Sequence, residues 1–131
     1  MAALEFETRR SGCYLGETAS LNIVNREIKI PQGNGKLFPG QVLAQADGAD
    51  ADTYVPHAPA AADGSQNASA ILFHPVDTAD ADVKTVATTN GPATVNGHEL
   101  TYADGITDAQ KAAAENALRE KGMAVLPQHA G

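Results

Sequence analysis

Between residues 21 and 100 the apolar residues fall into short runs, which proline, glycine or aspartate-rich segments separate. Several of these runs alternate apolar and polar residues, and this pattern is typical of β-strands rather than of amphipathic helices. A similar run returns near the C-terminus. The sequence therefore predicts a mainly β protein, with strands within 21–30, 37–43, 53–55, 70–73, 81–88, 95–100 and 123–126.

Turn-forming residues mark the ends of the predicted strands. Pro56 is expected to stop the strand at 53–55. Asn96-Gly97 predicts a type I′ turn, and therefore a tight hairpin, because both central residues of that turn have positive φ. The polar loop at 63–65 is expected to turn the chain into the buried strand that follows it.

One segment has the pattern of a helix, near residues 107–121. Thr107 and Gln110 have the spacing of a capping box, strong helix formers follow them, and Gly122 suits the C′ position. The apolar face is mostly small, so the helix can approach a sheet closely but buries little area. This predicted face consists of Ala109, Ala113, Ala114, Ala117 and Leu118.

The composition limits the size of the core. The 131-residue chain has no Trp, only three Phe and three Tyr, and much of its 43% hydrophobic content is alanine. Such a chain makes one domain, and one with so few large side chains often depends on oligomerisation. The first residues alternate weakly and break at glycines. We therefore expect a flexible N-terminal arm at 1–20 and a single β-rich domain at 21–131.

The distribution of charge limits the kinds of partner that the protein can bind. A formal net charge of −7 argues against nucleic acid, whose phosphates need clustered Lys and Arg. No Lys or Arg lies between Lys36 and Lys84, and the nine acidic residues outside this segment equal the nine basic residues of the chain. The excess negative charge therefore lies on Asp47, Asp50, Asp52, Asp63, Asp77, Asp80 and Asp82.

The alternating carboxylates at 47–52 and 77–82 are similar to those of calcium-binding loops. An EF-hand loop also needs a glycine at its sixth position and a glutamate at its twelfth, and neither segment has both. We therefore interpret the aspartates as a solvated acidic rim. No metal-ligand spacing relates the histidines, and we expect neither metal nor cofactor. The histidines are His57, His74, His98 and His129.

Candidate catalytic groups are few. Cys13 lies in the predicted arm, which does not by itself provide the base and oxyanion site that a nucleophilic thiol needs. Arg10-Ser11-Gly12 resembles a fragment of the phosphate-binding motif of trimeric dUTPases, but it is short and the companion motifs are missing. We expect no enzymatic activity, and a small trimeric β-fold nucleotide hydrolase is the alternative.

The sequence contains no signal-peptide pattern and no run of about 20 apolar residues, the length that a membrane-spanning helix needs. We therefore expect a protein that is made in the cytoplasm and does not bind a membrane.

Four segments, taken in order, resemble the head decoration proteins of lambda-type tailed bacteriophages. They are GKLFPGQVLAQ at 35–45, YVPHAPAAADGSQNASAILFHPVD at 54–77, ADVKTVATT at 81–89 and VNGHELTYADGITDAQKAAAENALREKGMAVL at 95–126. The resemblance implies a β-rich fold of the β-clip kind, without enzymatic activity. It also implies a homotrimer in the virion that binds the major capsid protein on the outside of an expanded head, at local threefold positions. There the trimer would stabilise the shell against the pressure of packaged DNA.

The resemblance further implies that the arm adds a strand to a sheet of the capsid protein. Leu4, Phe6 and Thr8 recur with period two, which suits strand addition. Ordering about six residues costs roughly 1–2 kcal/mol each, but three arms on one trimer can raise avidity by about 10²–10⁴. Deleting residues 2–15 is expected to abolish capsid binding and leave the trimer intact. The predicted capsid-binding residues are Leu4, Glu5, Phe6, Glu7, Thr8, Arg9 and Arg10.

Overall fold

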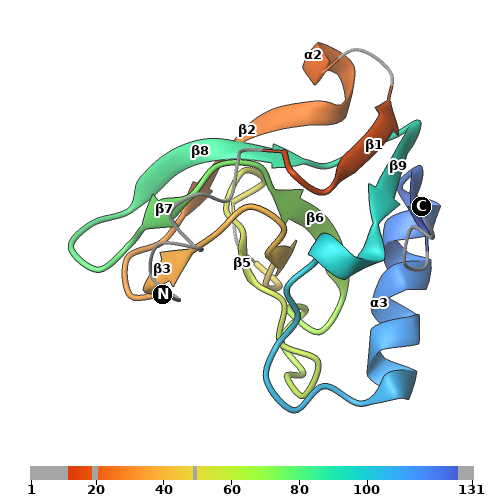
Figure 1. Cartoon of the computed structure of the whole chain (residues 1–131). Helices are drawn as coiled ribbons and strands as arrows, with labels where there is room; N and C mark the ends of the chain where they lie inside the picture. Colours follow the sequence, from red (N-terminus) through yellow and green to blue (C-terminus); the bar gives the residue numbers. More distant parts are fainter. Residues whose placement is uncertain (1–11, 19–20, 49, 127–131) are drawn as a thin grey trace, which may run out of the picture.

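The computed structural model describes residues 12–18, 21–48 and 50–126, and it is mainly β with one long helix near the C-terminus (Figure 1). This confirms the predicted fold class. In chain order the elements are β1 (Leu15–Thr18), α2 (Leu21–Val24), β2 (Asn25–Ile30), β3 (Lys36–Leu37), β4 (Val42–Ala44), β5 (Val55–Pro56), β6 (Ala68–Leu72), β7 (Val76–Asp77), β8 (Val83–Thr88), β9 (Ala93–Asn96), the 3₁₀ turn η1 (Gly97–Glu99), α3 (Asp108–Glu120) and β10 (Met123–Leu126).

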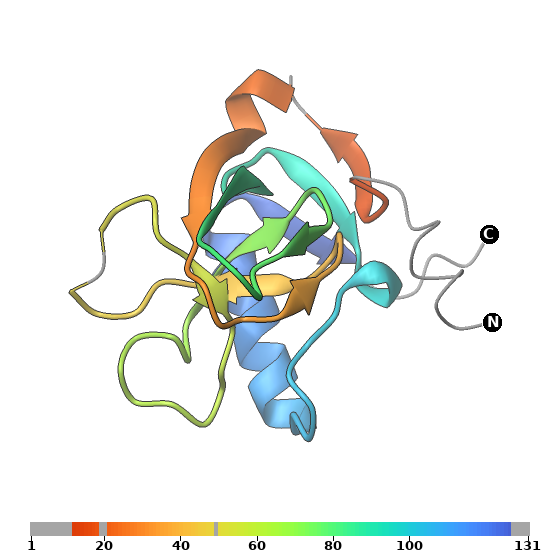
Figure 2. The ribbon, with the colours of Figure 1, turned by 90° about the vertical axis from the view of Figure 1, so that its left-hand side faces the viewer.

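The centre of the molecule is a five-stranded antiparallel sheet that curls into a small barrel (Figure 2). Its strand order is β2-β8-β6-β4-β5. The segment that leads into β5 returns to β2, where the Lys29 N–H donates to the Asp52 carbonyl at 2.7 Å and the Tyr54 N–H donates to the Lys29 carbonyl at 2.9 Å. Backbone hydrogen bonds therefore join the two edges of the sheet, and pairing of this kind protects edge strands from other chains.

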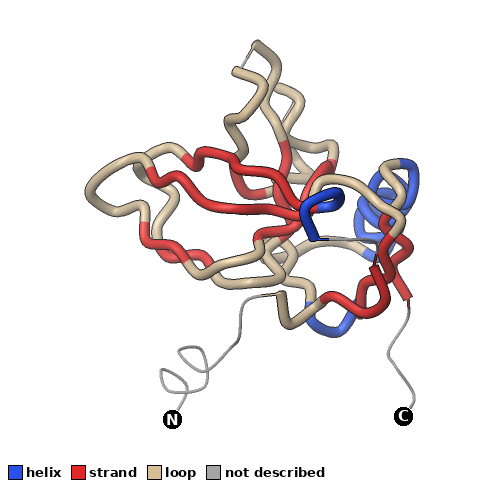
Figure 3. Tube along the Cα trace, turned by 90° about the horizontal axis from the view of Figure 1, so that it is seen from above, coloured by secondary structure: helices blue, strands red, loops and turns tan. Residues whose placement is uncertain are grey.

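A second sheet lies beside the barrel, with the order β1-β9-β10. Its strands β9 and β10 are parallel, and α3 connects them, which makes a β-α-β unit. The helix packs against β10 and β6, so it covers the side of the molecule where the two sheets meet (Figure 3).

Strand β6 separates two hydrophobic clusters. Its Ile71 side chain belongs to the cluster beneath α3, whereas Ala70 and Leu72 belong to the cluster inside the barrel. Burial on both faces explains why the predicted strand at 70–73 is an uninterrupted apolar run. The cluster beneath α3 contains Tyr14, Val42, Ala68, Ile71, Val95, Ala114, Leu118, Met123 and Val125. The cluster inside the barrel contains Ile28, Ile30, Leu37, Leu43, Tyr54, Ala70, Leu72 and Ala87.

The ends of α3 follow the sequence signals. The Gln110 N–H donates to Thr107 Oγ1 at 3.1 Å and the Thr107 N–H donates to Gln110 Oε1 at 3.0 Å, which is the predicted capping box. Gly122 follows the C-cap with φ of +96°, as expected of a C′ glycine.

The apolar face of α3 is narrower than predicted. Ala114 and Leu118 are buried and Ala117 is half-buried, but Ala109 and Ala113 are exposed. The helix therefore touches the sheets along one stripe only. No helix among the described residues is long and apolar enough to cross a membrane.

The predicted hairpin at 95–100 is wrong. Strand β9 ends at Asn96, and the chain then enters the 3₁₀ turn η1. The neighbours of β9 in its sheet are β1 and β10. Gly97 is not among the positive-φ glycines. A side chain there would bring a Cβ to 2.8 Å from the Leu126 carbonyl oxygen. The glycine is therefore needed for the close approach of β10 and not for a type I′ turn.

Strands β2 and β5 also have different ends from those predicted. Residues 21–24 form a helical turn, α2, and the strand begins at Asn25. Pro56 lies within β5, opposite Leu43 of β4. Proline is tolerated here because β5 is an edge strand, so Pro56 has a paired strand on one side only.

The boundary of the predicted arm at residue 20 is wrong as well. Residues 15–18 form β1, which pairs with β9 with a bulge between Leu15 and Thr18. Tyr14 is fully buried in the cluster beneath α3. The domain therefore includes residues 12–18, and a deletion of residues 2–15 would remove part of the core along with the arm.

Candidate functional site

The seven residues predicted to bind a capsid, Leu4 to Arg10, lie outside the described residues. The structure does describe the place where the segment that carries them joins the domain. We call this place, residues 12–15, the arm root. It forms a turn, because the Leu15 N–H donates to the Gly12 carbonyl at 2.9 Å.

Tyr14 fixes the arm root to the core. Its hydroxyl lies 2.6 Å from Thr88 Oγ1, and the Thr88 hydroxyl lies 2.7 Å from Asn25 Oδ1. Since each hydroxyl has one proton, these contacts form a relay in which Tyr14 donates to Thr88 and Thr88 donates to Asn25, with the Ile71 carbonyl oxygen 3.3 Å from the phenol as a weaker acceptor. Burial raises the pKa of the Tyr14 phenol far above its usual value, so the phenol stays neutral.

Gly12 packs against Phe73, the residue that follows β6. The Gly12 N–H donates to the Phe73 carbonyl at 2.9 Å, and the Gly12 backbone has φ of +67°. Between Gly12 and Tyr14, the half-buried Cys13 thiol lies 3.9 Å from the Pro39 carbonyl oxygen. The sequence predicted that Cys13 is a thiol on a flexible arm. In the structure it is instead part of a packed turn.

All seven aspartates of the predicted rim are exposed, which confirms that they face solvent. Several of them also hold turns together. Asp63 accepts from the Ser65 N–H at 3.1 Å and from the Ser65 hydroxyl, and these bonds lower the pKa of the Asp63 carboxyl. Asp82 accepts from the Gln32 N–H at 2.8 Å. The rim is therefore both a charged surface and a set of turn-forming carboxylates.

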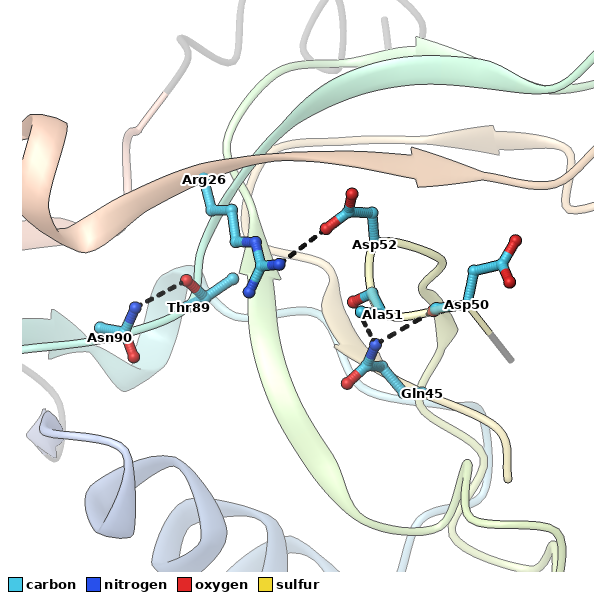
Figure 4. Close-up of polar contacts among 7 residues, drawn as sticks. All are labelled: Arg26, Gln45, Asp50, Ala51, Asp52, Thr89 and Asn90. Atoms are coloured by element: carbon cyan, nitrogen blue, oxygen red, sulfur yellow. Dashed lines mark hydrogen bonds and ion pairs between the residues drawn. The ribbon is translucent and has the colours of Figure 1, made fainter. Parts of the chain in front are cut away.

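One rim aspartate has a basic partner (Figure 4). Arg26 on β2 donates to Asp52 at 2.8 Å, next to the backbone hydrogen bonds that close the barrel. Gln45 donates to the Ala51 carbonyl at 2.6 Å and thereby holds the other side of the same loop. Both charged side chains are more than half exposed, and such pairs are worth about 0–1 kcal/mol. The contact therefore positions the acidic loop more than it stabilises the fold.

His57, at the end of β5, is buried, with 2% of its surface exposed. Its Nε2 lies 2.9 Å from the Gln66 carbonyl oxygen, and its Nδ1 has no hydrogen-bond partner in the described part of the chain. The ring therefore donates from Nε2 and stays neutral, and burial lowers the pKa of His57 below its ordinary value of 6.5. It joins β5 to the loop that leads into β6.

Two open depressions of about 340 Å³ each lie near the two ends of α3. The one at the C-terminal end is mainly polar, with Asp47, Ser69, Glu120 and Lys121 in its lining. The one at the N-terminal end is mainly apolar, between residues 58–60 and 103–107. Among the described residues, no three His, Cys, Asp or Glu side chains lie close enough together to hold a metal ion.

These observations define a small β-barrel protein with one long helix, in which a packed turn joins the N-terminal segment to the domain. A family model described as bacteriophage lambda head decoration protein D matches residues 6–123. No individual curated protein matches the chain.

The chain therefore belongs to the family of the bacteriophage lambda head decoration protein D, and it is a structural protein of a bacteriophage capsid. The matched range includes Phe6 to Arg10 of the predicted arm, whereas Leu4 and Glu5 precede it.

The residues that fix the arm root were not predicted from the sequence. Gly12, Tyr14, Phe73 and Thr88 come from three separate parts of the chain, and no local pattern relates them. One signal was present, because Tyr14 is one of only three tyrosines. An aromatic residue between two glycines can mark a packed turn as well as a flexible segment.

The first prediction concerns the relay. The substitution Tyr14→Phe keeps the ring but removes the hydroxyl, which leaves Thr88 without its buried donor. We expect a loss of about 1–3 kcal/mol in the free energy of unfolding, measured by urea denaturation. The matched control is Tyr102→Phe, whose hydroxyl has only the Glu115 carboxyl near it and makes no well-formed hydrogen bond among the described residues, so its loss should cost less. Equal stability of the two variants would contradict the role of the relay.

The second prediction concerns pH. Because the pKa of His57 in the folded protein is below 6.5, the unfolded chain binds the proton more readily than the fold does. The contribution of neutral His57 to the free energy of unfolding is therefore complete above pH 6.5, and it decreases as the pH falls through the folded-state pKa of His57. In denaturation experiments between pH 8 and pH 5, roughly the range in which histidines titrate, His57→Gln should lose part of the acid dependence. The variant of the exposed His74, His74→Gln, should keep it.

Proposed function

We propose that the protein is a cement protein. It binds as a homotrimer to the outside of an expanded bacteriophage head, where it contacts the major capsid protein and stabilises the shell against the pressure of packaged DNA. Its role in the particle is structural and needs no catalysis. The observation that carries the proposal is the family match over residues 6–123, which includes most of the predicted arm.

The arm root supports binding through the N-terminal segment. Tyr14 is fixed in the core, so we expect a force on the arm to be transmitted to the domain without separating β1 from β9. The arm itself carries the period-two pattern that suits strand addition. A binding segment that is joined firmly to a rigid body can hold two neighbouring capsid subunits together.

The small core supports the trimer. Most members of the two clusters are alanine, valine, leucine or isoleucine, and the only aromatic residues among them are Tyr14 and Tyr54. Burial of further surface between three copies would add to this modest core. The exposed Ile23, with 62% of its surface accessible, is an apolar side chain available to such a contact.

The acidic rim supports a position on the outside of the shell. Exposed carboxylates repel one another between neighbouring particles and keep a densely coated particle soluble. They would also be unfavourable next to packaged DNA, since DNA carries negative charge at every phosphate.

The alternative, a nucleotide hydrolase, depended on Arg10-Ser11-Gly12 as a phosphate-binding fragment. In the structure the Gly12 N–H already donates to the Phe73 carbonyl. It is therefore not available to a phosphate oxygen, as a backbone donor of a phosphate-binding loop must be. This observation favours the structural role.

The third prediction separates the domain from the arm. Deletion of residues 2–11, which ends before the arm root, should leave a folded trimer and abolish binding to expanded heads. Light scattering measures the mass, and co-sedimentation with purified expanded heads measures the binding. A monomeric full-length protein, or normal binding by the truncated one, would contradict the proposal. The longer deletion of residues 2–15 should also lower the free energy of unfolding, because it removes Tyr14.

The fourth prediction concerns the rim. The variant Asp47→Asn, Asp50→Asn, Asp80→Asn removes three exposed negative charges and leaves the Arg26–Asp52 pair intact. We expect unchanged binding to heads and more aggregation of decorated particles at low salt, measured by dynamic light scattering. Loss of binding without aggregation would show instead that the aspartates contact the capsid.

A further inference from the structure

We propose that Gly12 and Phe73 form a rigid elbow that sets the direction in which the arm leaves the domain, and that tight binding to heads depends on this direction. The inference rests on the proposed function and deepens it. It assigns positioning roles to two residues outside the predicted binding segment. Gly12 and Phe73 act on binding only through the arm.

The backbone of Gly12 has the conformation and the surroundings of a position that only glycine fills easily. Its φ of +67° lies in the left-handed region, which residues with a side chain rarely adopt. A Cβ at this position would also lie 2.6 Å from Cε1 and 3.0 Å from Cζ of the Phe73 ring. A side chain at residue 12 therefore collides with the Phe73 ring, and we expect the turn to move away from Phe73 and lose the Gly12 N–H···O=C bond.

The Phe73 ring cannot easily give way. The Phe73 N–H donates to the Val86 carbonyl at 3.0 Å, which fixes its backbone to β8. The ring packs against the cluster beneath α3 and meets the His74 ring edge to face, with the centroids 4.9 Å apart. Phe73 is thus a firm support on one side of the turn.

The other side of the turn is equally fixed. Two residues after Gly12, the Tyr14 side chain enters the core and makes the relay with Thr88. The Asn96 N–H donates to the Tyr14 carbonyl at 2.8 Å, which holds the backbone as well. The chain is therefore attached immediately after Gly12 and at Gly12 itself, so its orientation at this residue is defined by the domain.

A defined orientation matters because the proposed binding is multivalent. Three arms raise avidity only if each can reach its site while the others are bound, and the gain is lost when the geometry does not permit this. An elbow that aims each arm raises the effective concentration of the arm at its site. A freely jointed connection would lower it.

The experiment compares full-length variants for binding to purified expanded heads. Gly12→Ala changes the elbow. Gly35→Ala is the matched control, because Gly35 has a similar φ of +70° but nothing within 4 Å of its added Cβ, so it reports left-handed backbone strain without a collision. The double variant Gly12→Ala, Phe73→Leu removes the two ring atoms nearest to the added Cβ. A further variant inserts Gly-Ser-Gly-Ser between Ser11 and Gly12, which leaves the elbow and the fold unchanged but loosens the arm.

We expect Gly12→Ala and the insertion to weaken binding by about 10-fold or more, a part of the multivalent gain. Gly35→Ala should bind as the wild type does, and Phe73→Leu should restore part of the binding of Gly12→Ala. Thermal unfolding and light scattering confirm that each variant is folded and trimeric. Wild-type binding by both Gly12→Ala and the insertion would overturn the elbow and leave the proposed function intact. Failure of the wild type to bind, or binding by the protein that lacks residues 2–11, would overturn the proposed function itself.

Discussion

The hydrogen-bond relay of Tyr14 joins the N-terminal turn to the barrel, and the arrangement of both depends on it. The phenol comes from the N-terminal turn, Thr88 from β8 of the barrel, and Asn25 from the first residue of β2. A buried hydroxyl without a partner is costly, so the relay specifies one position for the turn. The barrel and the arm root, which leads directly into β1 of the second sheet, are thereby held in one arrangement.

The rest of the architecture shows how a chain with few large side chains makes two clusters. β6 is buried on both faces and contributes side chains to both clusters, so fewer apolar residues are needed elsewhere. The barrel is closed by backbone hydrogen bonds between Lys29, Asp52 and Tyr54. Helix α3 adds only a narrow stripe with Ala114 and Leu118 at its centre. A domain of this kind suits a protein that works as part of an assembly, where neighbouring subunits provide further contacts.

The sequence predicts those features that depend on neighbouring residues. The capping box at Thr107 and the C′ glycine at residue 122 follow from local rules, and the structure confirms them. A buried strand predicted at 70–73 is also present, at Ala68–Leu72. The features that failed depend on contacts between distant residues. Asn96-Gly97 is not a hairpin because β10 approaches Gly97, and the first residues are not all arm because Tyr14 meets Thr88. The aspartates were correctly expected to face solvent, but the pairing of Asp52 with Arg26 could not be foreseen across 26 positions.

The central claim is that a firmly attached N-terminal segment connects this decoration protein to its capsid. A cryo-electron microscopy reconstruction of expanded heads decorated with the full-length protein tests it most directly. The account predicts continuous density from Gly12 outward through residues 4–10, lying as an additional strand beside a sheet of the capsid protein. Density in which those residues fold back on their own domain, with the capsid contacted through α3 or the acidic rim instead, would contradict it.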